Sequence, residues 1–254
     1  MRNPIFTKTH YKVTKTVLII GALITGLLSC IIGILAFFGQ NLGTFVANVD
    51  NNSYLAGIIL SDDKDFKGAY PRLLVNPLKN AFPVTYGDFE AEIETIKQTD
   101  GDYPNGSNNI IGYTFYLMNE GNAIGDVKKN IVINKKTNNV EKAIRIMLFE
   151  TRLSPSGEEL EEQVHIYEHL DLDENGEPEK KHPLDATPEE LVTYFKDDSV
   201  VFENVIRDLR PGEVVKYTII VWLEGWDAQC DEFNKGGQLK MAMNFEVIST
   251  KTEE

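Results

Sequence analysis

The longest uncharged stretch of the chain lies between Lys15 and Asp50. Inside it, residues 17–39 read VLIIGALITGLLSCIIGILAFFG, a run of 23 residues that are almost all apolar. A helix of that length extends about 34 Å, enough to cross a hydrocarbon core of about 30 Å. We therefore predict a transmembrane helix at residues 17–39, a basic tail at residues 1–16 and an outer domain at residues 40–254.

The formal charge divides at the end of this run. The first 39 residues contain no acidic residue and four cationic ones, Arg2, Lys8, Lys12 and Lys15. Because the whole chain has a net charge of −14, the other 215 residues carry −18. Cations on the N-terminal side keep that side in the cytoplasm, which predicts a single-pass cell-membrane protein with an extracellular C-terminal domain. The acidic domain would repel phosphate, so nucleic acid is excluded as a partner.

Two other interpretations of the apolar run stay open. A cleaved signal peptide has a shorter apolar core and a small-x-small cleavage site, whereas the bulky Phe37 and Phe38 stand near the end of this run. A lipoprotein signal would be acylated at Cys30, which ends a Leu-Leu-Ser-Cys word, but the apolar run continues past it. We favour the uncleaved anchor.

Small residues recur every four positions within the predicted helix, at Gly21, Thr25, Ser29 and Gly33. Such a stripe lets two helices approach closely, which predicts a possible homodimer through this face. Small residues are also common in membrane helices that do not associate.

Beyond Asn41 the apolar residues alternate with a period of two, which is typical of strands with one buried face. The alternating runs are 111–117, 144–148, 215–223 and 239–247, with a fifth strand at 201–206. Arg210-Pro211-Gly212-Glu213 supplies a turn. We predict a mostly β fold, an antiparallel β-sandwich of Ig-like or jelly-roll-like type.

Three further segments carry local predictions. Thr187-Pro188-Glu189-Glu190 resembles a capping box and predicts a short helix ending near Phe195. A strand is expected from about Gln163. The segment 42–49 alternates as a strand, and we expect it to pair within its own domain rather than with a neighbouring molecule, so that the anchored protein forms no fibres.

Several words of the sequence resemble a known group of proteins. They include Tyr113-Thr-Phe-Tyr-Leu-Met-Asn119, Leu209-Arg-Pro-Gly-Glu213 and, most specifically, Trp222-Leu-Glu-Gly-x-Asp227-x-x-Cys230. The chain resembles an uncharacterised family of membrane-attached exported proteins of Firmicutes over most of residues 12–248. More distantly it resembles matrix proteins of the TasA/camelysin type, which are β-sandwiches. The resemblance implies no activity for any residue.

His165-Ile-Tyr-Glu-His169 matches the H-x-x-E-H word of inverted metallopeptidases. The two histidines share a metal ion only if they lie on a helix, and a third ligand is needed. On a strand they would stand about 13 Å apart. A membrane-tethered zinc-dependent hydrolase using His165 and His169 is therefore an alternative function, and the ordinary interpretation is two surface histidines.

Asp171-Leu-Asp-Glu-Asn-Gly-Glu177 resembles the first half of a calcium loop. The second half does not fit, because His182 stands where the bidentate Glu is expected. A solvated acidic turn explains the same residues without an ion, so we predict no cofactor.

Cys230 is the only cysteine outside the apolar run, so an intradomain disulfide is excluded and the thiol is either inert, reactive or paired between molecules. Trp222 and Trp226 flank Leu-Glu-Gly and would suit contact with a sugar or a protein if both were exposed. The sequence as a whole favours a surface-displayed structural or interaction protein without catalysis, and a ligand-binding module is a further alternative.

Overall fold

The computed structural model describes residues 44–251 except residues 79–80 and 105–108. The basic tail, the apolar run with its small-residue stripe (Gly21 to Gly33) and Cys30 lie outside the described residues. Among the described residues, no helix combines the length and apolar character that crossing a bilayer requires.

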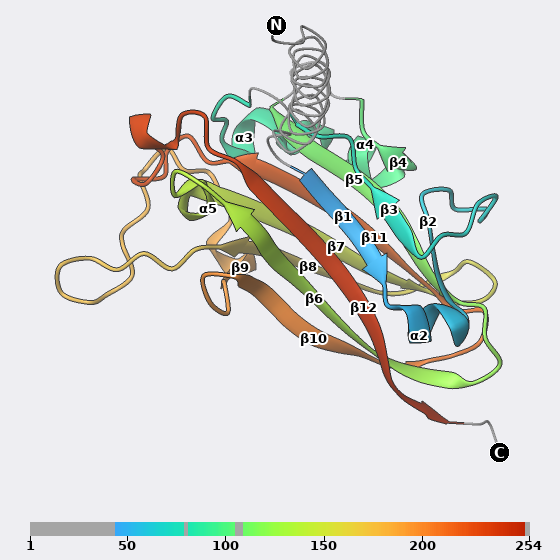
Figure 1. The fold of residues 1–254 in the computed structure, drawn as a ribbon. Helices are drawn as coiled ribbons and strands as arrows, with labels where there is room; N and C mark the ends of the chain where they lie inside the picture. Colours follow the sequence, from blue (N-terminus) through green and yellow to red (C-terminus); the bar gives the residue numbers. More distant parts are fainter. Residues whose placement is uncertain (1–43, 79–80, 105–108, 252–254) are drawn as a thin grey trace, which may run out of the picture. The chain divides into compact units, whose positions relative to one another are not determined.

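Two β-sheets form the framework of the described chain (Figure 1). The five-stranded sheet has the order β10 (Val200–Leu209), β6 (Ile124–Lys136), β12 (Leu239–Lys251), β1 (Thr44–Val49) and β3 (Arg72–Leu74). The seven-stranded sheet has the order β2 (Ile58–Ser61), β5 (Ile110–Asn119), β11 (Val214–Leu223), β7 (Ile144–Leu153), β8 (Glu159–Glu168) and β9 (Val192–Tyr194), with β4 (Gly101–Asp102) also paired to β5. The prediction of a mostly β fold is confirmed.

Short helical segments connect the strands. They are α2 (Asn51–Leu55), α3 (Tyr86–Phe89), η1 (Glu90–Glu92), α4 (Ile93–Gln98), α5 (Val140–Ala143), η2 (Glu189–Leu191) and η3 (Glu232–Asn234). Figure 1 shows α2 and α5 at opposite ends of the strands.

The two sheets face each other across one apolar core, and the predicted alternation supplies it. The inward residues of four strands are those that the sequence pattern singles out: 111–117 of β5, 144–148 of β7, 215–221 of β11 and 239–245 of β12. At its centre the Tyr217 ring stacks on Phe115 at 5.2 Å and lies 5.4 Å from Phe245 of the other sheet. Burial of these stripes on both sheets stabilises the two-layer arrangement.

The prediction that all strands pair antiparallel is wrong for two pairs. β1 runs parallel to β12, with Phe45 opposite Met241, and β8 runs parallel to β9. Parallel neighbours cannot be joined by a tight hairpin, so a long connection must separate them in the chain. Nearly the whole domain separates β1 from β12, and local turn signals therefore carry no information about their pairing.

β1 is paired along both of its edges. It lies between β12 and β3, with Ala47 opposite Met243 on one side and Leu73 on the other. The prediction that the segment 42–49 pairs within its own domain is confirmed for its described residues 44–49. The absence of fibres remains a prediction.

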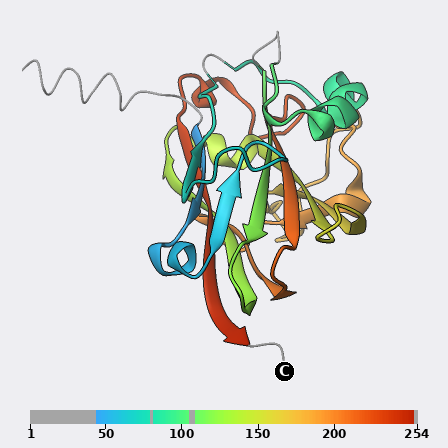
Figure 2. The same cartoon turned by 90° about the vertical axis from the view of Figure 1, so that its right-hand side faces the viewer.

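The seven-stranded sheet is buried on both faces, which the alternating pattern did not predict. Helical residues at positions 86, 89, 93 and 96 cover its outer face, where the Phe89 ring meets Trp222 at 5.0 Å. Figure 2 shows this teal segment on the side of the sheet that faces away from β12. The same positions lie on one face of a helix, and the Asp88 carboxylate accepts the backbone N–H of Thr85 at 2.9 Å, as in one half of a capping box. These signals in the sequence would have revealed the cover.

The predicted helix from Thr187 to Phe195 is wrong. Only a single 3₁₀ turn forms at η2, after which the chain continues as β9 beside β8. Val192, Thr193 and Tyr194 are strong strand formers, and pairing with β8 satisfies their backbone groups. The strand expected from Gln163 is present as β8 and begins earlier, at Glu159.

Candidate functional site

An apolar cavity of about 670 Å³ lies at the end of the sheets where α5 is found. Its walls come from both sheets, with Ile111 and Val221 on one side and Leu239 and Met241 on the other. These four residues belong to the inward stripes that form the core farther along the strands. The cavity is therefore the open end of the core, and the alternation that builds the core also makes its walls apolar. Its volume falls in the range of about 300–1,000 Å³ that is usual for ligand sites.

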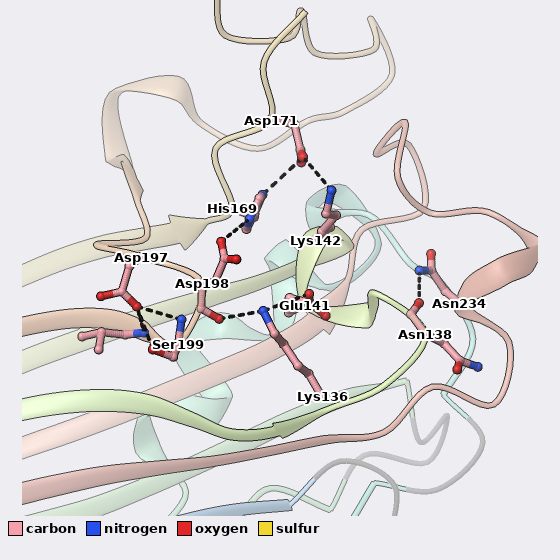
Figure 3. Close-up of polar contacts among 11 residues, drawn as sticks. Lys136, Asn138, Glu141, Lys142, His169, Asp171, Asp197, Asp198, Ser199 and Asn234 are labelled. Atoms are coloured by element: carbon pink, nitrogen blue, oxygen red, sulfur yellow. Dashed lines mark hydrogen bonds and ion pairs between the residues drawn. The ribbon is translucent and has the colours of Figure 1, made fainter.

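The loop from residue 230 to residue 237 forms another wall of the cavity. The Asn234 side chain donates a hydrogen bond to the Asn138 carbonyl at 2.9 Å, and the Asn138 side chain donates one to the Lys235 carbonyl at 2.8 Å. Figure 3 shows the first of these contacts. The loop ends at Gly237, a position that requires glycine because a Cβ there would lie 2.8 Å from the Asn234 carbonyl oxygen. Reciprocal bonds of this kind hold a loop in one shape.

The Trp222–Cys230 motif, the most specific part of the sequence resemblance, directly precedes this loop. Glu224 is fully buried and accepts hydrogen bonds from the Trp222 indole at 2.9 Å and from the Trp226 backbone N–H at 3.2 Å. Burial raises the pKa of Glu224 above its ordinary value. Gly225 donates its backbone N–H to Val84, where the chain enters the helical cover. The hydrogen bonds of Glu224 and Gly225 therefore fix the start of the loop to the sheet and to the helical cover.

Arg145 of β7 anchors the chain just before this loop, at Asp227, from the outer face of the sheet. It lies in register between Trp222 of β11 and Glu168 of β8. Its Nε is 2.8 Å from the Glu168 carboxylate, and its guanidinium also binds Asp227. All three side chains are at least nine-tenths buried, so each charge depends on its partners.

Cys230 lines the cavity and is half-buried. Burial, and then the neighbouring carboxylates of Asp227 and Glu224, raise the pKa of its thiol to about 11. The thiol is therefore protonated at neutral pH, whereas a cysteine nucleophile needs a lowered pKa. This environment favours the inert thiol among the interpretations of Cys230.

A second, polar hollow of about 180 Å³ is lined by Arg145, Glu168 and the segment 226–228, among others. The His182 ring stacks on Trp226 there at 4.6 Å. Trp226 is 42% exposed, whereas Trp222 is 1% exposed. The two tryptophans therefore do not form a common surface.

The two histidines of the zinc word lie on and just beyond a strand. His165 stands opposite Leu148 within β8, and His169 follows the end of β8. Four residues along a strand span about 13 Å, too far for one ion. Figure 3 shows His169 between Asp171, at 3.3 Å, and Asp198, at 3.4 Å. Within the described ranges, no group of three His, Cys, Asp or Glu residues is placed to hold a metal ion.

The acidic loop from Asp171 to Glu177 folds as a turn around Asp173. One carboxylate oxygen of Asp173 accepts the backbone N–H groups of Asn175, at 2.8 Å, and Glu177, at 3.0 Å. Gly176 has a φ of 81°, which a side chain rarely adopts. Asp171 pairs instead with His169 and with Lys142. The carboxylates thus serve the turn and its neighbours and do not converge on one point.

An ion pair joins the two sheets inside the core, and the sequence analysis missed it. Lys129 of β6 and Glu150 of β7 both point inward and contact each other, and the Lys129 ammonium lies 5.8 Å from the centre of the Tyr217 ring. Burial lowers the pKa of Lys129 to about 7. The signal was present, because Lys129 stands in the apolar stripe of Val127, Ile131 and Ile133.

In comparisons with known proteins, no family model, no curated protein and no solved structure matches this chain. The choice between candidate functions therefore depends on the geometry described above. The apolar cavity is the largest of three hollows among the described residues; the hollow beside Trp226 is smaller than an ordinary ligand site, and a third, of about 340 Å³ and lined in part by Asn76, Asp102 and Tyr103, lies near the lower limit of the range.

Proposed function

We propose that this chain is a single-pass, surface-displayed binding protein without catalytic activity, whose outer domain receives an apolar ligand in the cavity at the end of the sheets. The observation that carries the proposal is the cavity itself, about 670 Å³ with walls from both sheets. The anchor at residues 17–39, with the N-terminus in the cytoplasm, is part of the proposal and is supported by the charge pattern.

The proposal includes a β-sandwich fold of Ig-like or jelly-roll-like type for the outer domain. The two facing sheets support it. A loop held by Asn138 and Asn234 keeps one wall of the cavity in place without a ligand. A wall that is already ordered lowers the entropy cost of binding. The protonated thiol of Cys230, on the same wall, suits a cavity that binds a molecule without reacting with it.

The proposal is tested on residues 40–254, made without the first 39 residues. The core between the sheets, the helical cover and all the strand pairings found among the described residues lie within residues 44–251, so this segment has what it needs to fold. A cooperative unfolding transition verifies the fold before binding is measured. The probe is N-phenyl-1-naphthylamine, an uncharged molecule whose fluorescence rises in apolar surroundings.

We expect saturable binding of one probe molecule per chain. Ala81 is exposed and lines the cavity, so Ala81→Trp places an indole at the mouth and should weaken binding at least tenfold. Ala56, exposed after α2 at the far end of the sheets, provides the matched control, and Ala56→Trp should leave the affinity unchanged. Absence of saturable binding by the folded segment, or equal affinity in the two variants, would refute the proposed function.

A further inference from the structure

Exposed aromatic side chains lie beside the opening of the cavity. Phe82 lines the cavity and is 70% exposed. Phe233 stands between Glu232 and Asn234, which both line the cavity, and it is 81% exposed. Two exposed aromatic rings beside an apolar opening are typical of a surface that contacts another apolar phase.

The strand that follows the proposed anchor begins at the same end of the sheets. Thr44 opens β1 opposite Lys240, and Phe45 stands opposite Met241, a residue of the cavity wall. The proposed helix ends at Gly39, so residues 40–43 are all that precede β1. Four residues reach about 14 Å when fully extended. The cavity end is therefore the end of the outer domain that an anchor at residues 17–39 would hold beside the bilayer.

Charge restricts which lipids approach this end. The side chains around the cavity are of mixed charge, with Asp231, Glu232 and Lys235 on the loop and Lys135 and Lys240 at the adjoining ends of β6 and β12. The outer domain as a whole carries a formal charge of −18. This net negative charge repels an anionic headgroup and does not act on a headgroup without net charge.

We infer that the cavity takes one acyl chain of a membrane lipid without net charge, supplied by the bilayer in which the protein is anchored. The inference rests on the proposed function, because it names the class of apolar ligand that the same cavity binds. Acyl chains are apolar along their length and need no polar partner inside the cavity. Phe82 and Phe233 would lie at the level of the headgroups, where aromatic rings are favoured.

The test uses the full chain in phosphatidylcholine vesicles that contain a phosphatidylcholine with a diazirine at the end of one acyl chain. Irradiation attaches that lipid to whatever its chain end touches, and mass spectrometry of peptides locates the attachment. We expect attachment at two places, within residues 17–39 and at cavity residues such as Leu223 and Met241. Attachment within residues 17–39 serves as the control, because it shows that the protein is inserted in the bilayer.

Ala81→Trp should reduce attachment at the cavity at least tenfold and leave attachment within residues 17–39 unchanged. In a second set of vesicles, phosphatidylglycerol replaces half of the phosphatidylcholine and carries the diazirine. Attachment at the cavity should be reduced there too. Attachment within residues 17–39 alone, or cavity attachment that is insensitive to both changes, would overturn the inference. The proposed function would survive that result if the segment 40–254 still bound the naphthylamine probe, and both would fall if it did not.

Discussion

Replacing Glu150 with leucine should destabilise the outer domain by about 3–5 kcal/mol at pH 7 or below, because it leaves Lys129 buried without its partner. The Lys129 side chain is 6% exposed and points into the core between the sheets. Replacing both residues, as Lys129→Met with Glu150→Leu, should recover most of the loss, since the apolar pair needs no desolvated charge. Urea unfolding of residues 40–254 measures both effects.

The stability that Lys129 withholds from the outer domain should return as the pH rises above 7, in the wild-type sequence and in the Glu150→Leu variant alike, so this rise should be missing from the Lys129→Met, Glu150→Leu double variant. Burial lowers the folded-state pKa of Lys129 to about 7, below its unfolded value of about 10.5. Between these values the unfolded chain binds more protons than the folded one, so stability rises with pH in that window. Glu203 on the surface, which pairs with both Lys196 and Lys128, is the control, and Glu203→Leu should cost about 1 kcal/mol or less. Equal losses from the two single variants would contradict a buried charge between the sheets.

Replacing Arg145 with methionine should also cost about 3–5 kcal/mol, because Asp227 would stay buried without its cation and Glu168 would keep only Lys181. The loop that bears Cys230 would lose its anchor at the same time, so we expect the naphthylamine affinity of the remaining folded protein to fall. Lys251→Met is the control, since Lys251 and its partner Asp208 are both more than half exposed. It should change stability by about 1 kcal/mol or less and leave binding unchanged. Comparable losses in the two variants would show that Arg145 does not anchor the loop.

Much of the fold could be predicted from local sequence patterns. Period-two alternation located the inward stripes of β5, β7, β11 and β12, and the turn at residues 210–213 was confirmed by the φ of 77° at Gly212. The helical cover was also predictable from the spacing of Tyr86, Phe89, Ile93 and Ile96, although it was missed. Patterns of this kind report on neighbours within a few residues, which is why they succeed for strands and turns.

The rest depends on contacts between distant parts of the chain. Nothing near Phe45 in the sequence specifies that its strand runs parallel to β12, or that Lys129 meets Glu150 across the core. Trp222 is buried because the helical cover packs on the outer face of the sheet, and the sequence of the strand alone does not reveal that cover. The cavity exists because the two sheets and the loop at residues 230–237 leave space between them, and no single segment encodes that space.

The central claim is that an apolar ligand occupies this cavity, and the reactivity of Cys230 tests it most directly. Cys230 lies on the cavity wall, and residues 40–254 contain no other cysteine. The measurement is the alkylation rate of Cys230 in this segment by N-ethylmaleimide at pH 9, with and without saturating N-phenyl-1-naphthylamine. An occupied cavity predicts alkylation at least tenfold slower with the probe in the wild-type sequence, and no such protection in the Ala81→Trp variant. Saturable probe binding that leaves the alkylation rate of Cys230 unchanged would place the ligand elsewhere and contradict the claim.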